Sequence, residues 1–197
     1  MNEIIRNILC RRSIRACTQT PLPDDVLKTI VDCGLYAPTG HNEQNTRILV
    51  IRDPETLSQM NAVVQKQLLA LDPVPGSVMN GGIRRARTPG YHFIHGAPVL
   101  ISVSAPRDGY NSMAECAAAV ENMLLAASSL GLASCWSNQP HWFTAVPEMR
   151  AFFEPLGLRE DEDIFASLSL AYPKAPLVPS MPPRKEGRFA CDIPLKD

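Results

Sequence analysis

The sequence predicts an α+β protein, because segments with the apolar period of a helix are interleaved with short apolar segments typical of strands. The chain has 197 residues, of which 45% are apolar, and a formal net charge of −1. A chain of this length buries roughly 70% of its unfolded surface around one core. We therefore expect residues 1–197 to form one domain.

Four segments have a helical pattern. Residues 4–9 and 26–35 repeat their apolar residues at helical spacing. In the third, Asp53-Pro54 is typical of an N-cap and first turn, and predicts a helix to about Leu71. The fourth, 112–130, begins with the capping-box pattern Ser-Met-Ala-Glu, ends at a glycine and is apolar on nearly all faces, as in a buried central helix.

Strands are expected at 46–51, 97–105, 132–137 and 164–172, which are short and rich in aliphatic residues. Between the third helix and the second strand, residues 72–90 are rich in Gly, Pro and Arg and show no apolar period. We expect that segment to be a surface excursion or a lid that controls access to a site.

The last 25 residues contain six prolines, which exclude a helix or a central strand. They also contain apolar side chains that need a surface to cover, namely Leu177, Val178, Phe189, Ile193 and Leu195. A disordered tail is the alternative.

The segment Arg11-Arg12-Ser13-Ile14-Arg15 places three guanidiniums and a hydroxyl within five residues. Such a concentration of like charge favours a multivalent anion among the side chains, and a phosphate is the obvious one. A solvated helix end is the alternative.

A second polar segment, Ala37-Pro38-Thr39-Gly40-His41-Asn42-Glu43-Gln44, combines a stiff turn, a flexible glycine and two carboxamides. This combination suits a chain that runs close to a polar heterocycle and hydrogen-bonds its edge. An ordinary loop is the alternative. Together the two segments indicate a bound nucleotide or flavin.

The order and spacing of these segments resemble those of the nitroreductase family of FMN-dependent oxidoreductases. That family has an Arg-Arg-Ser-x-Arg type segment followed by an Ala-Pro-Ser-Gly-x-Asn-x-Gln type loop, in which Thr39 stands here for Ser. The resemblance continues through segments 96–101, 119–127, 130–136, 169–173 and 183–185.

The resemblance implies a three-layer α/β/α sandwich with a mostly antiparallel central sheet and a domain-crossing C-terminal tail. It also implies a homodimer, in which residues 172–197 embrace the partner subunit and the two FMN sites lie at the interface.

The resemblance further implies which residues hold FMN. Arg11, Ser13 and Arg15 would bind its phosphate, with Arg184 or Lys185 closing the other side, and Arg12 would reach the ribityl chain or the pyrimidine edge. The loop of the partner subunit would contribute Pro38, Thr39, Gly40, Asn42 and Gln44. Trp136, Ser137 and Asn138 would aim backbone donors at flavin N5 and O4.

The implied reaction takes hydride from NADH or NADPH through flavin N5 to a small electrophile such as a nitroaromatic, a quinone or an enone, by ping-pong kinetics. No side chain has to act as a nucleophile, so we name no catalytic residue. The alternatives are a flavin-binding or flavin-delivery protein with little turnover, a member specialised for oxidation or dehalogenation, and a cofactor-free interaction protein. The choice between NADH and NADPH and the physiological acceptor stay open.

Some positions depart from the family pattern. Asn45-Thr46 follows Gln44 where many members have Pro-Trp, and Ser137-Asn138-Gln139-Pro140 stands where many have Gly-Gly. Ala171 replaces the usual Gly before Tyr-Pro. These differences leave the substrate open and the cofactor expectation largely intact.

Charge and composition exclude several other functions. The net charge of −1 favours neither nucleic acid nor an anionic membrane, and no apolar stretch is long enough to span a bilayer. Six cysteines without a CxxC pair or secretory segment predict reduced thiols in the cytoplasm. A metal at His92-x-x-His95 is not expected, because on a strand-like approach the two rings would point to opposite faces.

Overall fold

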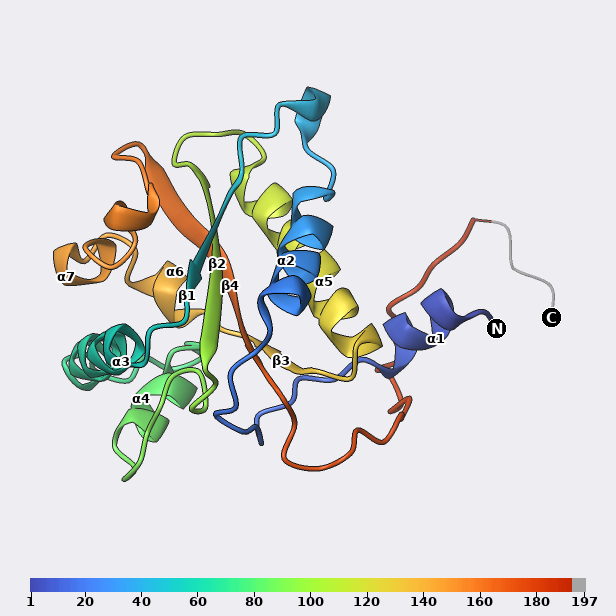
Figure 1. The fold of residues 1–197 in the computed structure, drawn as a ribbon, viewed down its shortest axis with the longest axis horizontal. Helices are drawn as coiled ribbons and strands as arrows, with labels where there is room; N and C mark the ends of the chain where they lie inside the picture. Colours follow the sequence, from blue (N-terminus) through green and yellow to red (C-terminus); the bar gives the residue numbers. More distant parts are fainter. Residues whose placement is uncertain (193–197) are drawn as a thin grey trace.

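Residues 1–192 are described by the computed structural model, in which one antiparallel sheet is flanked by helices (Figure 1). Its strand order is β1-β2-β4-β3, and all three strand pairs are antiparallel. The strands are β1 (Arg47–Ile51), β2 (Val99–Pro106), β3 (Ala133–Trp136) and β4 (Glu162–Ala171). Each lies within two residues of its predicted bounds, and the α+β class is confirmed.

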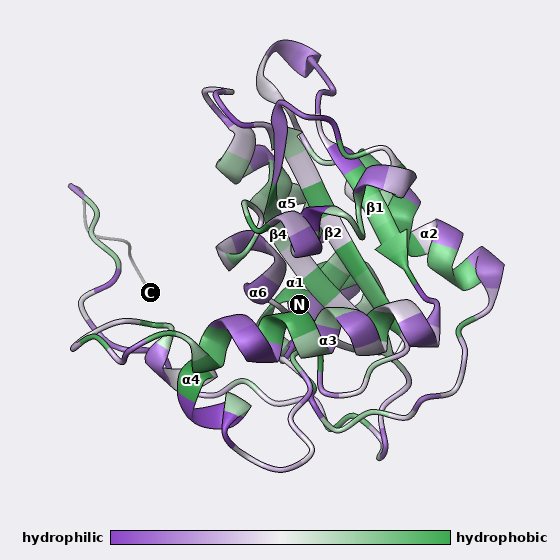
Figure 2. Ribbon diagram, turned by 90° about the vertical axis from the view of Figure 1, so that its left-hand side faces the viewer, coloured by the Kyte–Doolittle hydropathy of each residue, from purple (hydrophilic) through white to green (hydrophobic). Residues whose placement is uncertain are grey.

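Helices cover both faces of the sheet, because successive strand side chains point in opposite directions. Ile101 and Leu168 pack with α2 (Asp24–Leu35) and α5 (Ser112–Ser129). Leu100 packs on the other face with residues of α3 (Pro54–Leu69) and α4 (Asn80–Ala86). Figure 2 shows the strands as mainly hydrophobic and α3 as a helix with alternating polar and apolar positions. The expected three layers are therefore present.

The central helix α5 is as buried as predicted, but its capping box is not formed. The Ser112 hydroxyl donates to the Pro106 carbonyl at 2.6 Å, and the Glu115 side chain accepts from Gly40 N–H instead of capping its own helix. Glu115 thus bonds to Gly40, which is distant in the sequence, instead of to the start of its own helix. Close packing of α5 against α2 depends on Gly34, where a Cβ would lie 2.9 Å from Met123 Cγ.

Two other helices begin at side-chain caps. Asp53 Oδ2 accepts from Thr56 N–H at 2.8 Å, which confirms the predicted start of α3. Helix α1 (Glu3–Cys10) begins with Asn2 Oδ1 accepting from Ile5 N–H at 2.9 Å. No residue of α1 is buried, and Ile4 is 71% exposed. The apolar side of α1 therefore lacks a complete cover within the described chain.

Segment 72–90, which we expected to be a surface excursion or a lid, contains the short helix α4. Ile83 and Ala86 of α4 are buried against the core, and Gly82 lies close to Leu68 of α3. Three buried positions, one of them a glycine, are too few to produce a visible apolar period. Further short helices also escaped prediction: η1 (Gly40–Asn42), α6 (Gln139–Trp142), α7 (Pro147–Arg150) and η2 (Glu154–Leu156).

The C-terminal segment leaves the sheet after β4 and passes α1 (Figure 1). Residues 174–192 contain no helix or strand, as expected, and Val178 and Phe189 are 81% and 73% exposed. Ile193 and Leu195, which we also expected to cover a surface, lie outside the described residues. No helix within residues 1–192 is long and apolar enough to cross a membrane.

Candidate functional site

The arginine segment follows α1 and runs along the end of the sheet. Ile14 N–H donates to the Ser134 carbonyl of β3 at 2.9 Å, and Thr18 N–H donates to the Tyr172 carbonyl at 2.8 Å. These two bonds fix the backbone from Ile14 to Thr18. They therefore set the position from which the Arg15 side chain extends.

The predicted phosphate ligands have different surroundings. Arg11 lies 3.4 Å from Glu121, and Arg12 donates to the backbone oxygens of Leu9, Arg11 and Ser180. Ser13 and Arg15 are exposed. Arg15 makes no hydrogen bond or ion pair with any residue in the described part of the chain, which leaves its guanidinium available to a ligand.

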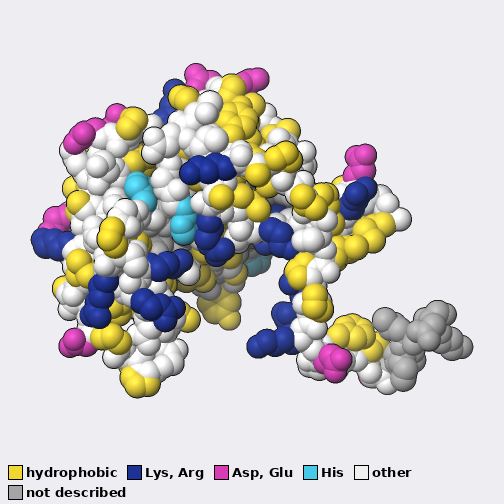
Figure 3. All heavy atoms as spheres, turned by 90° about the horizontal axis from the view of Figure 1, so that it is seen from below, with side chains coloured by type: hydrophobic (Ala, Val, Ile, Leu, Met, Phe, Trp, Pro, Cys, Tyr) yellow, Lys and Arg dark blue, Asp and Glu magenta, His cyan; other side chains and the backbone are white. Residues whose placement is uncertain are grey.

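A cavity of about 490 Å³ lies beside Arg15, within the size range of small-molecule sites. Segment 85–96 supplies most of its wall, Gln19 lies on the Arg15 side and Gln139 comes from α6. The lining side chains are mainly polar or aromatic: Arg15, Gln19, Arg85, Thr88, Tyr91, His92, Phe93, His95 and Gln139. Figure 3 shows histidines surrounded by Lys and Arg side chains on the lower face of the molecule.

The charge in this cavity is uncompensated. Arg85 also has no ion pair with a described residue, and no acidic side chain is among those that line the cavity. Burial lowers the pKa of His92, and burial together with the nearby Arg15 and Arg85 guanidiniums lowers that of His95. The cavity is therefore positively charged through its arginines and is suited to an anion.

The expected divergence of His92 and His95 is wrong, because the chain turns there instead of forming a strand. His95 has φ 57° and Gly96 has φ 72°, and both imidazoles line the same cavity. A non-glycine residue in this region of φ often marks a functional site. Within residues 1–192, no group of three His, Cys, Asp or Glu side chains is arranged to hold a metal.

The loop after β3 is tightly bonded. Trp136 Nε1 donates to Asn138 Oδ1 at 2.6 Å, and the buried Ser137 hydroxyl donates to Gln139 Oε1 at 2.9 Å. Ser137 N–H donates to the Ser167 carbonyl of β4 at 2.9 Å. This backbone donor, expected to reach the flavin, is therefore occupied within the fold, whereas Trp136 and Asn138 remain candidates.

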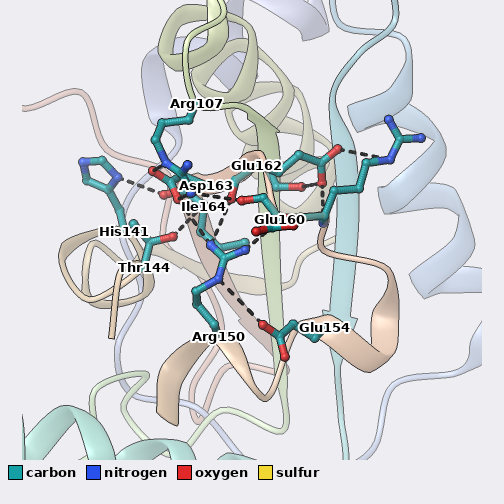
Figure 4. A network of polar contacts seen from close by, with 11 residues as sticks. Arg107, His141, Thr144, Arg150, Glu154, Glu160, Glu162, Asp163 and Ile164 are labelled. Carbon is teal, nitrogen blue, oxygen red and sulfur yellow. Dashed lines mark hydrogen bonds and ion pairs between the residues drawn. The ribbon is translucent and has the colours of Figure 1, made fainter. Parts of the chain in front are cut away.

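A polar network joins α6 and the segments that follow it to the start of β4 (Figure 4). His141 Nδ1 lies 2.9 Å from the Ile164 carbonyl, and Ile164 N–H donates to the Thr144 hydroxyl at 3.0 Å. Arg150 reaches Asp163 at 3.3 Å and donates to the Glu162 carbonyl at 3.0 Å. These bonds fasten α6 to the sheet and so hold Gln139 at the cavity.

The second predicted segment, 37–44, lies at the other end of the sheet (Figure 1). It leads into Arg47 of β1, which pairs with Ser104 near the end of β2, whereas the cavity residue Gly96 precedes the start of β2. The eight residues of β2 separate the two ends by about 25 Å. One chain therefore does not bring Thr39 or Gln44 to Arg15.

The remaining predicted residues are also apart from the cavity. Arg184 and Lys185 are exposed on the tail. Sequence reasoning did not assign Arg85 and Gln139 to the site. The cluster Arg84-Arg85-Ala86-Arg87 was a usable signal for the first, whereas only the fold shows that Gln139 faces the same cavity.

The sequence profile described as "Nitroreductase family" matches residues 8–172, so the chain belongs to the nitroreductase family. A provisionally named NADH dehydrogenase/NAD(P)H nitroreductase of Archaeoglobus fulgidus is 29% identical over 88% of this chain and 87% of its own. The FMN-bound nitroreductase of Bacteroides fragilis has a TM-score of 0.85 and 29% identity, with 97% and 99% of the chains covered. An FMN-bound nitroreductase of Desulfitobacterium hafniense gives 0.83 and 25%, with 98% and 100% covered.

Proposed function

We propose that this protein is an FMN-dependent oxidoreductase that takes hydride from NADH or NADPH and reduces a small nitroaromatic, quinone or enone by a ping-pong mechanism. The observation that carries the proposal is the 490 Å³ cavity. It is lined by Arg15 and Arg85, neither of which has an ion pair with a described residue, and no carboxylate lines it. Family membership and the FMN in two similar structures support the same cofactor here.

The residues around the cavity fit a flavin nucleotide. Arg15 and Gln139 line the cavity and would supply donors for the phosphate and a polar group for the edge of the ring. Ser13 and Asn138 are close to them in the sequence and would add to the two sets. Arg11 and Arg12 reach the cofactor only by exchanging their present partners. When bound, FMN supplies reversible hydride transfer, while the protein orients the ring and excludes water from it.

We propose further that the working unit is a homodimer. The predicted FMN-binding residues lie at opposite ends of the sheet, so Pro38, Thr39, Gly40, Asn42 and Gln44 can join Arg15 only from a second copy. The uncovered apolar side of α1 and the exposed tail offer surfaces for that copy, and the tail would bring Arg184 and Lys185. All six cysteines are free, which suits the reducing cytoplasm.

The visible spectrum of the purified protein tests this proposal. With FMN supplied, an anaerobic addition of NADPH or NADH should bleach the yellow colour, and an electrophilic acceptor should restore it. A yellow protein that neither donor bleaches would instead be a flavin carrier or a member specialised for oxidation or dehalogenation. A protein that takes up no FMN would refute the proposal.

A further inference from the structure

Among the described residues, the loop formed by residues 37–44 has one hydrogen bond to an element distant in the sequence, besides that of Ala37 N–H to the Gly34 carbonyl at the end of α2. Gly40 N–H donates to Glu115 Oε1 on α5 at 2.7 Å. The other bonds of this loop are local, such as Gln44 N–H to the Thr39 hydroxyl at 3.1 Å. Residues 41–44 are exposed, and the buried Glu115 side chain supplies the hydrogen bond that ties this part of the loop to α5 through Gly40.

This anchor is unusual in its chemistry. Glu115 is 7% exposed, and its second oxygen, Oε2, is buried without a hydrogen-bond partner. A buried carboxylate that accepts only one hydrogen bond is costly. Stability alone gives no reason for that placement.

The loop held by Glu115 is also strained and closely fitted. His41, Asn42 and Gln44 have φ values of 50°, 56° and 50°, and they are three of the four non-glycine residues with positive φ in residues 1–192. A Cβ on Gly40 would lie 2.9 Å from Asn111 Nδ2 and 3.4 Å from Glu115 Oε1. Such strained backbone persists only where the surroundings impose it.

We propose that Glu115 is a positioning residue for cofactor binding. It holds Gly40, and through it Asn42 and Gln44, in the conformation that contacts the flavin of the partner subunit. This inference rests on the proposed function. If the loop populates that conformation only part of the time, the apparent FMN affinity is the intrinsic affinity multiplied by the populated fraction, so the Glu115 bond acts on affinity without touching FMN.

The test compares three variants of the full-length protein. Glu115→Ala removes the anchor, whereas Glu115→Gln keeps an oxygen that can accept from Gly40 N–H. Ser112→Ala is the matched control, because it removes a buried hydrogen bond one turn earlier on α5 and leaves the loop untouched. For each we would measure FMN affinity by flavin fluorescence, amide hydrogen exchange at 40–44 without FMN, and thermal unfolding.

We expect Glu115→Ala to weaken FMN binding at least about tenfold and to speed exchange at Gly40. Glu115→Gln should restore affinity to within about threefold, and Ser112→Ala should lower the unfolding temperature without changing affinity. If Glu115→Ala does not fold, Glu115→Asp takes its place, because the shorter aspartate side chain cannot reach Gly40 N–H.

If Glu115→Ala changes neither the FMN affinity nor the hydrogen exchange at Gly40, the inference is overturned. An affinity loss in Ser112→Ala equal to that in Glu115→Ala would do the same, since it would reflect stability alone. If the wild-type protein takes up no FMN, the proposed function fails, whereas the exchange experiment still tests whether Glu115 holds the loop.

Discussion

Replacing Arg15 with alanine tests the proposed phosphate contact with little disturbance of the fold. Arg15 is exposed and makes no hydrogen bond or ion pair with a described residue, so folding should change by no more than about 0.5 kcal/mol. A hydrogen bond to a charged group contributes about 1.5–3 kcal/mol. The FMN dissociation constant should therefore rise by about 10- to 150-fold.

The assay is a flavin fluorescence titration at low and high salt, alongside thermal unfolding without FMN. Arg87→Ala is the matched control, because Arg87 is also exposed and unpaired among residues 1–192 but does not line the cavity. It should change affinity only slightly, and that change should disappear at high salt. Equal losses in the two variants would show a general field effect and refute a direct Arg15 contact.

Three other perturbations have outcomes that the structure sets. Glu162→Ala removes a carboxylate that is 2% exposed and accepts from Arg47, the Ser104 hydroxyl and Arg159 N–H, so it should cost about 3 kcal/mol and lower the melting temperature by about 6–12 °C. An unchanged melting temperature would contradict this role of Glu162. Gly34→Ala should cost about 1–3 kcal/mol, because the added Cβ would lie 2.8 Å from Ile48 Cδ1 and 2.9 Å from Met123 Cγ; an unchanged free energy of chemical unfolding would contradict close packing at this position. His95→Asn tests pH dependence: burial and neighbouring arginines lower the pKa of His95 from 6.5, so the unfolded chain takes up the proton first and stability declines as pH falls below 6.5. Asn tolerates the same φ, and unfolding measured across that range should show a shallower decline than wild type; an identical slope would exclude His95 as its source.

Local patterns predicted the elements whose causes are local. Asp53 caps α3 as expected because its partner, Thr56, is three residues away. The capping box at Ser112 failed because Glu115 has a partner 75 residues away, which no local pattern reveals. Helix α4 was missed because only a few of its positions face the core.

The site was predictable in kind but not in arrangement. The arginine segment indicates an anion, yet nothing in its sequence separates Arg12, which bonds to three carbonyls, from Arg15, which has no partner in the described chain. His92 and His95 share a cavity because the chain turns at Gly96, a property of backbone φ that the spacing does not encode. Gln139 reaches the same place through the packing of α6 on β4.

The separation of the two polar segments at opposite ends of the sheet has a genetic consequence if the dimer forms as proposed. Each site takes Arg15 from one subunit and Gln44 from the other. A mixed dimer made from an Arg15→Ala chain and a Gln44→Ala chain would then carry both lesions in one site and neither in the other. Two inactive alleles expressed together would complement each other, and the restored activity would come from one intact site per heterodimer.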